Sequence, residues 1–202
     1  MPSNTRPPAA RSVAAGAVLD DAPAASTTVR FWVIVVITVA LDFLTKAWAV
    51  ENLVPRHMPH EIIGDLVRFT LTYNPGAAFG MHLGPASRWI FAGLSVIIVG
   101  FLLKATGELT RTSKLAAFGV PVIVGGAIGN LLDRIRLREG VVDFIDIGIG
   151  ATRFWTFNVA DTAVSIGAVC LVLALWQEDL AIQAAAKAAG ATGAEGQGGG
   201  AS

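Results

Sequence analysis

Residues 31–50 read FWVIVVITVALDFLTKAWAV, and this run indicates the class of the protein. Its only charged side chains are Asp42 and Lys46. A helix of about 20 residues that rises about 1.5 Å per residue is long enough to cross the hydrocarbon core of a bilayer. The run therefore predicts a transmembrane helix that carries two charges inside or near the membrane.

Three further apolar runs follow, at about 89–103, 115–132 and 157–176. The composition agrees with a membrane protein, because 53% of the residues are hydrophobic and only 15% are charged, against about a quarter charged in soluble domains. The mean hydropathy is +0.61. We therefore expect an all-α membrane protein with four transmembrane helices, which places both termini on one side of the membrane.

The long segment between the first two runs, residues 51–87, carries the pattern of a small sheet. Residues 65–73 are rich in β-forming side chains with partial alternation, and Asn74-Pro75-Gly76 supplies a turn. We expect a small β-sheet between helices one and two that lies on the membrane surface. Basic residues are equally divided between the two sides of the predicted topology, so charge leaves the orientation open.

The two ends of the chain differ in composition from the part between them. Residues 1–29 are rich in Ala, Pro, Ser and Thr, and residues 179–202 are rich in Ala and Gly. Such segments bury too little apolar surface to fold. We therefore expect a disordered N-terminal tail, a single membrane domain over residues 30–178, and a largely disordered C-terminal tail. Fifteen basic residues balance 15 acidic ones, so net charge gives no reason to expect a nucleic-acid partner.

Several polar side chains lie within or beside the apolar runs, where they are costly and therefore indicate function. Asp42 and Lys46 are four residues apart on one helix face. They either neutralise each other near the membrane surface, with Lys46 extending toward water, or support a site. Asn130 lies one turn inside the third run and must find a hydrogen-bond partner. The glycines before it, Gly125 and Gly129, are typical of close helix packing.

Two aspartates lie in apolar surroundings beyond the third run. Asp143 is part of VVDFI, residues 141–145, where burial would raise its pKa unless the segment is an exposed strand. Asp161 follows Asn158 at the start of the fourth run, which also fits a helix cap. The helix count places both aspartates on the side of the long loops. Paired carboxylates that share one proton activate water in aspartic proteases.

The sequence gives no sign of a cofactor or metal site. The single cysteine, Cys170, lies in an apolar run and is a poor nucleophile there. His57 and His60 flank Pro59, which favours a turn over a metal site. We therefore expect neither a metal nor a cofactor.

Five blocks together point to a family. They occur in the order 42–46 (DFLTK), 74–80 (NPGAAFG), 125–134 (GGAIGNLLDR), 141–145 (VVDFI) and 157–161 (FNVAD). At these residues the chain closely resembles the lipoprotein signal peptidase family, also called signal peptidase II. The resemblance covers about residues 31–176.

The resemblance implies an aspartic endopeptidase that removes the signal peptide from diacylglyceryl-modified prolipoproteins, cutting before the lipidated cysteine without a cofactor. Asp143 and Asp161 would be the catalytic pair. The residues that bind substrate or support the site would be Asp42, Lys46, Asn74, Gly76, Asn130, Asp133, Arg134 and Asn158. Phe43 departs from the family pattern, which commonly has Gln there, and this weakens a hydrogen-bonding role at that position.

The resemblance also implies a location in the bacterial cytoplasmic (inner) membrane. Both termini would be cytoplasmic, and the active site would lie at the outer face under an extracytoplasmic β-sheet cradle. The partners would be lipid-modified prolipoproteins, membrane lipids and globomycin-type inhibitors.

Two other classes of protein compete with this interpretation. A small ion-coupled transporter would use Asp42 and Asp161 as proton carriers, but such transporters usually show repeated halves or broken helices. The sequence shows neither. A non-enzymatic membrane scaffold would explain the glycines but not the polar residues near them.

Overall fold

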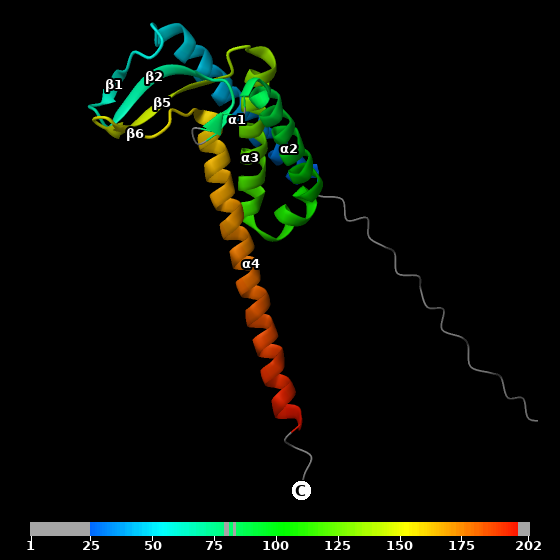
Figure 1. The fold of residues 1–202 in the computed structure, drawn as a ribbon. Helices are drawn as coiled ribbons and strands as arrows, with labels where there is room; N and C mark the ends of the chain where they lie inside the picture. Colours follow the sequence, from blue (N-terminus) through cyan, green and yellow to red (C-terminus); the bar gives the residue numbers. More distant parts are fainter. Residues whose placement is uncertain (1–24, 79–80, 83, 198–202) are drawn as a thin grey trace, which may run out of the picture.

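A computed structural model describes residues 25–78, 81–82 and 84–197. Within these ranges the chain forms four long helices, which are α1 (Ala25–Asn52), α2 (Ser87–Thr112), α3 (Lys114–Arg136) and α4 (Val159–Gln197). Each contains a segment long and apolar enough to cross a membrane, which confirms the predicted helical class (Figure 1). Residues 1–24 of the predicted N-terminal tail lie outside the described residues, and residues 25–29 already belong to α1.

Two helices extend further than their apolar runs predicted. α2 continues past Leu103 to Thr112, and α4 continues past Trp176 to Gln197. The predicted end at Trp176 is therefore too early, and residues 179–197, predicted as part of a disordered tail, are helical. Hydropathy detects contact with lipid, whereas Ala-rich and charged sequence keeps a high helix propensity after lipid contact ends. Figure 1 shows α4 projecting well beyond the other three helices.

α3 is the central helix, and it packs against α1, α2 and α4. Glycines let the backbones of α3 and α4 approach closely, because a Cβ atom at Gly119 would lie 2.7 Å from the carbonyl oxygen of Gly167. A hydrophobic cluster that includes Val35 of α1, Leu102 of α2 and Val124 of α3 fills the bundle interior. α3 is mostly buried, whereas the other three helices expose large apolar side chains such as those expected to face lipid.

A four-stranded antiparallel sheet covers one end of the bundle (Figure 1). Its strand order is β1 (His60–Ile63), β2 (Val67–Asn74), β5 (Val141–Ile149) and β6 (Thr152–Arg153). A short hairpin of β3 (Ala77–Ala78) and β4 (Met81–His82) follows β2. The sheet was predicted between helices one and two, but β5 and β6 come from the segment between α3 and α4. The sheet is therefore larger than predicted and joins both long loops.

The central strand pair brings one aspartate to the bundle. β2 and β5 pair in a register that places Thr72 opposite Asp143. Val142 and Phe144 pack on Ala49 and Leu53 of α1. Because side chains alternate along a strand, Asp143 between them points away from that cluster, toward the beginning of α4.

Candidate active site

A buried lysine connects two helices where the sheet meets the bundle. The Nζ atom of Lys46 lies 2.8 Å from Oδ2 of Asp42 and 3.0 Å from Oδ2 of Asp133, and it donates to Oδ1 of Asn130 at 2.9 Å. Only 2% of the Lys46 side chain is exposed. The possibility that Lys46 extends toward water is therefore wrong. Its ammonium group turns inward because α3 supplies a second carboxylate and an amide oxygen.

Asp42 also fixes the first turn of α4. Its Oδ1 atom accepts a hydrogen bond from the backbone N–H of Ala160 at 2.9 Å. Close helix packing makes this contact possible, since a Cβ atom at Gly129 would lie 2.5 Å from Oδ2 of Asp42. The glycine is needed here because any larger residue would displace the carboxylate that holds Lys46.

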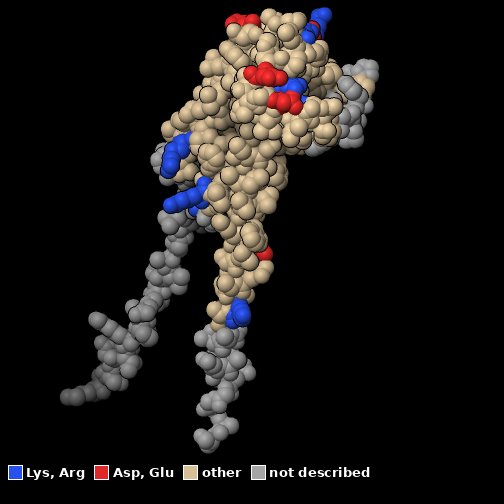
Figure 2. Space-filling view, turned by 90° about the vertical axis from the view of Figure 1, so that its left-hand side faces the viewer, with Lys and Arg blue, Asp and Glu red and all other residues tan. Residues whose placement is uncertain are grey.

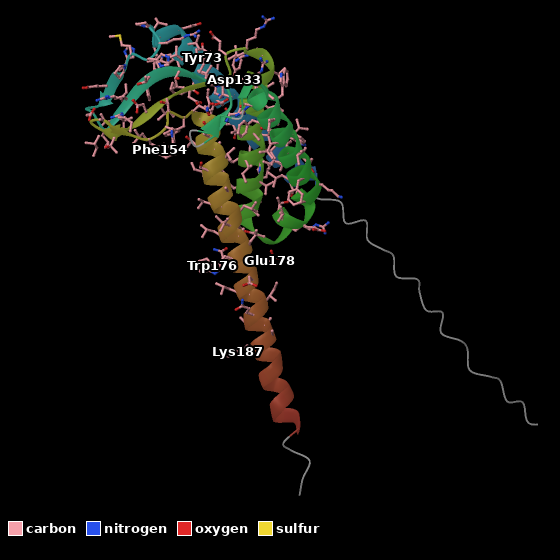
Figure 3. All side chains as sticks on the ribbon, in the orientation of Figure 1. Tyr73, Asp133, Phe154, Trp176, Glu178 and Lys187 are labelled. Atoms are coloured by element: carbon pink, nitrogen blue, oxygen red, sulfur yellow. The ribbon has the colours of Figure 1, made fainter. Side chains whose placement is uncertain are left out.

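Asp133 links the end of α3 to the sheet. Its Oδ2 atom, which faces Lys46, also accepts from the backbone N–H of Val142 at 3.3 Å, and its Oδ1 atom pairs with Arg136 at 3.0 Å. The ion pairs of Asp133 are thus made with Lys46 and Arg136. Figure 3 shows Asp133 near the junction of sheet and bundle, whereas Glu178 and Lys187 lie far along α4.

Arg134 follows Asp133 in sequence but has different surroundings. It donates to the backbone carbonyl of Asn130 at 3.2 Å, and its guanidinium carbon lies 5.7 Å from the ring centroid of Phe91. Its Nε atom is buried and has no hydrogen-bond partner among the described residues. A buried donor of this kind is available to a bound molecule.

Two asparagines organise the carboxylates between them. The Nδ2 atom of Asn130 donates to Oδ1 of Asp161 at 2.7 Å, and its Oδ1 atom accepts from Lys46 and from Nδ2 of Asn158. The Asn158 Nδ2 atom lies 2.6 Å from Oδ1 of Asp143 and 3.2 Å from the carbonyl oxygen of Val142. Asn158 is fully buried. The requirement that Asn130 find partners is met by this network.

Asp161 caps α4 and faces the network at the same time. Its backbone N–H donates to Oδ1 of Asn158 at 2.9 Å, and its Oδ2 atom accepts from the backbone N–H of Asn158 at 3.2 Å. This reciprocal pair is a helix capping box, which confirms the capping interpretation. The Oδ1 atom of Asp161 accepts a hydrogen bond from Asn130. The capping bond therefore occupies only the Oδ2 atom of the carboxylate.

Asp143 is more deeply buried than Asp161. Only 3% of Asp143 is exposed, which excludes the alternative of an exposed strand at this residue. The pKa of Asp143 is raised to about 7, mainly by burial and also by the nearby charge of Asp161, although hydrogen bonds from Asn158 and Asn74 act in the opposite direction. Two neighbouring carboxylic acids therefore have unequal surroundings.

Asn74 and Gly76 bring the end of β2 toward this site. The Asn74 side chain hydrogen-bonds to Asp143, and its Oδ1 atom accepts from the backbone N–H of Gly76 at 3.0 Å. Gly76 has a φ of +112°, and a Cβ atom there would lie 2.7 Å from Cβ of Ser87. The turn therefore requires glycine for two reasons, its left-handed backbone and its contact with the start of α2.

One supporting residue has no recognisable sequence signal. Arg88, in the first turn of α2, donates to the backbone carbonyls of Arg134 and of Ile135, the latter at 2.9 Å. These carbonyls lie in the last turn of α3, where backbone acceptors lack helical partners. Arg88 and Arg134 are 46 residues apart, so only the folded arrangement of α2 against α3 brings them together.

The structure brings most of the predicted site residues into one cluster at the sheet end of the bundle. The members are Asp42, Lys46, Asn74, Asn130, Asp133, Arg134, Asp143, Asn158 and Asp161. They come from α1, α3, α4 and both central strands, so the cluster forms only when the helices and the sheet assemble together. Part of the block 74–80, residues 79 and 80, lies outside the described residues.

Comparison with known proteins gives a consistent result. The family model described as signal peptidase (SPase) II matches residues 34–177. The lipoprotein signal peptidase of Halothermothrix orenii is 39% identical over 150 residues, which cover 73% of this chain and 96% of that protein. The lipoprotein signal peptidase of Serratia proteamaculans is 37% identical over 152 residues, which cover 75% of this chain and 89% of that protein.

Two solved structures of bacterial membrane enzymes have a similar fold. One superimposes with a TM-score of 0.64 at 28% identity and covers 74% of this chain and 88% of that chain. The other has a TM-score of 0.62 at 29% identity and covers 72% of this chain and 91% of that chain.

Proposed function

The chain belongs to the signal peptidase II family, and from this premise we propose how its buried carboxylates cleave a peptide bond. It is a multi-pass bacterial membrane protease that removes signal peptides from prolipoproteins. We propose that it is an aspartic endopeptidase with Asp143 and Asp161 as its catalytic pair. Membership of a peptidase family removes the basis for the transporter alternative.

The observation that carries this proposal is that one residue, Asn158, contacts both carboxylates. Its side-chain amide donates to Asp143, while its backbone N–H and its side-chain oxygen bond to Asp161. The two acids are therefore held at a fixed separation before substrate arrives. Catalysis depends on groups held in the productive geometry in advance.

The two acids differ in their surroundings, and this difference indicates which of them carries the one proton that the pair shares. Asp161 lies in the first turn of α4, where the helix dipole stabilises negative charge, and it accepts hydrogen bonds from two asparagines. Arg134 adds a positive charge near both acids. Asp143 is buried, with a pKa of about 7. We therefore assign the role of base to Asp161 and the role of acid to Asp143, which carries its proton at pH values below about 7.

The proposed reaction begins with a water molecule between the two acids. Asp161 takes a proton from this water as the water oxygen attacks the carbonyl carbon of the scissile peptide, and Asp143 gives its proton to the carbonyl oxygen. The tetrahedral intermediate collapses when the proton on Asp161 passes to the leaving nitrogen and Asp143 recovers its own. Peptide and water become a carboxylic acid and an amine, and no cofactor takes part.

Arg134 is the substrate-binding residue with the clearest physical support. Its Nε donor is buried and unpartnered among the described residues. A substrate backbone carbonyl would satisfy this donor and would place the neighbouring peptide bond beside the two acids. Asn130 is committed to Lys46, Asn158 and Asp161, so we assign it to positioning the base.

The position of the site suits a lipid-modified substrate. The polar cluster joins residues of α1, α3 and the start of α4 to the sheet. Figure 1 shows this end of the bundle, where the helices meet the sheet, and it corresponds to the boundary between hydrocarbon and water. We propose that the signal helix enters from the bilayer, that the diacylglyceryl chains remain in lipid, and that cleavage occurs before the lipidated cysteine. The site would face the outside, the termini the cytoplasm, and globomycin-type peptides would occupy the substrate site.

A cleavage assay tests the chemistry and the substrate. Purified full-length protein in detergent is incubated with one prolipoprotein in two forms, with and without diacylglyceryl on its cysteine. We expect cleavage of the lipidated form only, a new N-terminus at the modified cysteine by mass spectrometry, and inhibition by globomycin. Equal cleavage of both forms, or cleavage at another bond, would contradict the proposed substrate.

Accessibility labelling tests the orientation independently. Cys170 is replaced by Ala, and a single cysteine is introduced at Glu61 or at Glu108, which are exposed at opposite ends of the bundle. In intact cells, a membrane-impermeant maleimide should label position 61 and not position 108. The reverse pattern would place the site in the cytoplasm.

A further inference from the structure

A cavity lies at the end of the bundle opposite the sheet. It has a volume of about 710 Å³ and is bordered by the beginning of α1, the last turns of α2 and the beginning of α3. Pockets of about 300–1,000 Å³ are the usual size for small ligands. The cavity shares no residue with the polar cluster, and the proposed reaction makes no use of it.

Among the described residues, the charged side chains that line this cavity are all basic. They are Arg30 and Lys114, and no Asp or Glu of the described part of the chain borders the cavity. Neither cation has an ion pair or a hydrogen bond among the described residues. Glu108, the carboxylate nearest in sequence on α2, is not one of the lining residues. Figure 2 shows basic side chains on this part of the bundle. Unpaired cations in a partly enclosed space favour an anionic ligand.

The uncharged lining combines two kinds of surface. Hydroxyl groups of Thr27 and Thr28 border the cavity, and they are donors suited to a phosphate. The beginning of α3 adds the positive end of a helix dipole. The apolar part of the lining includes Phe31, Trp32, Ile34, Leu103 and Phe118. A ligand that matches both surfaces has an anionic head and an apolar tail.

We propose that this cavity binds one anionic phospholipid from the leaflet on the side of the termini. Its phosphate lies between Arg30 and Lys114, and its acyl chains follow Trp32 and Phe118 into the surrounding lipid, since both side chains are about half exposed. Basic pockets between transmembrane helices at a membrane surface are suited to anionic lipid headgroups. Because the lipid contacts α1, α2 and α3 together, binding stabilises the folded bundle.

The test compares two lipids with the same acyl chains and different charge. Purified full-length protein in detergent is titrated with dioleoyl phosphatidylglycerol or dioleoyl phosphatidylcholine, and Tm and bound lipid by native mass spectrometry are recorded. We expect a saturable rise in Tm and one retained lipid with phosphatidylglycerol. The variant Arg30→Gln/Lys114→Gln should bind it at least about tenfold more weakly. The variant Lys104→Gln/Lys187→Gln removes the same charge from exposed positions outside the cavity and should bind normally.

A steric variant keeps the proposal testable if the charge variant does not fold. Gly107 lines the cavity, and a Cβ atom there would meet nothing within 4 Å. The substitution Gly107→Leu should therefore fold normally and exclude the lipid. The proposal fails if phosphatidylcholine stabilises equally, if both charge variants lose binding alike, or if Gly107→Leu retains the lipid. It also fails if glycerol 1-phosphate, which has no acyl chains, stabilises as much as the lipid.

Discussion

The charged residues at the two ends of the helix bundle differ in their burial and in their partners. At the sheet end, Lys46 is 2% exposed and is held by Asp42, Asp133 and Asn130. At the other end, Arg30 and Lys114 border a cavity and have no partner among the described residues. The charge of Lys46 has partners within the protein, whereas Arg30 and Lys114 have none among the described residues and can accept them from a ligand.

This difference distinguishes charged residues that position other residues from charged residues that can bind a ligand. Burying a charge costs free energy, and a buried ion pair offsets this cost only when each polar atom has a hydrogen-bond partner. The Lys46 group meets this condition and thereby fixes α1 and α3 relative to each other and to the start of α4. Its members hold the aspartate pair in place. Charges without partners retain their attraction for an incoming ion. The same kind of substitution should therefore change stability or cleavage activity more at the sheet end than at the other end.

The largest effect is expected at the aspartate pair. Asp143→Asn and Asp161→Asn should each reduce cleavage of lipidated prolipoprotein by far more than tenfold, because an amide neither accepts a proton from water nor shares one. The double variant should be scarcely worse than either single one, since the pair acts as a unit. Turnover by purified protein with a defined substrate measures this.

The matched control for these variants is Asp179→Asn, which lies on the exposed part of α4 and contacts only Gln183 among the described side chains. It should keep full activity. Asp146 is not a neutral control, because it accepts from Thr70 and pairs with Arg153 inside the sheet. More than about a tenth of normal turnover in Asp143→Asn or Asp161→Asn would show that the substituted residue is not a member of the catalytic pair.

The second prediction applies one substitution at both ends. Lys46→Met leaves Asp42 buried without a cation and leaves Asp133 paired with Arg136 alone, and removal of one partner from a buried pair costs about 3–5 kcal/mol. Lys114→Met removes an exposed cation that has no partner among the described residues and should change stability by less than about 1 kcal/mol. Thermal unfolding in detergent without added phospholipid compares them. Similar losses of stability in the two variants would show that the Lys46 group is not a structural centre.

The sequence predicted the residues of this centre but not their partners. Helical spacing places Asp42 beside Lys46, and this pair is present. Nothing in the spacing brings Asp133, on another helix, within 3.0 Å of the same ammonium group. That contact depends on how α1 and α3 pack, and therefore on Gly129, whose missing side chain leaves room for the Asp42 carboxylate.

The fold was predictable to a similar degree. Apolar runs locate membrane helices because lipid contact requires them, but they did not predict that α2 reaches Thr112 or that α4 reaches Gln197. The β2 segment was recognised from its own pattern. Its pairing with β5 was not, because strand partners that are far apart in the sequence, such as Val67 and Ile147, leave no local signal.

A third prediction concerns pH. Asp143 has a pKa of about 7 in the folded protein and about 3.9 in an unfolded chain. Between these values the folded state holds a proton that the unfolded state has lost, so this residue makes stability fall as pH rises from about 4 to 7. Asp143→Asn removes the effect and should be more stable than the parent protein at pH 8, by at most about 4 kcal/mol.

Thermal unfolding at pH 8 and at pH 4.5 measures this difference. The gain in Tm should be present at pH 8 and should largely disappear at pH 4.5, while Asp179→Asn should show no such change. A gain of the same size at both pH values would indicate better packing instead of a missing ionisation.

The fourth prediction compares glycines at the two ends. In Gly129→Ala the new Cβ atom would lie 2.5 Å from the Asp42 carboxylate, and overpacking of this kind typically costs about 1–3 kcal/mol. In Gly107→Ala the new atom meets nothing within 4 Å, and alanine favours a helix by up to about 1 kcal/mol over glycine. Tm should therefore fall in the first variant and stay equal or rise in the second. A fall of equal size in both would mean that glycine matters to these helices for backbone reasons alone.

The smallest effect is expected from removing residues 181–202, because the part of this segment that the structure describes contributes to neither charged group. All side chains from residue 175 to residue 188 are exposed, so little packing is lost. The remaining part of α4, from Val159 to Leu180, is about 33 Å long at about 1.5 Å per residue, which still spans the hydrocarbon core. The shortened protein should keep its Tm within a few degrees and its cleavage rate within about twofold. A loss of activity beyond tenfold at unchanged expression would mean that the projecting end of α4 takes part in positioning the active site.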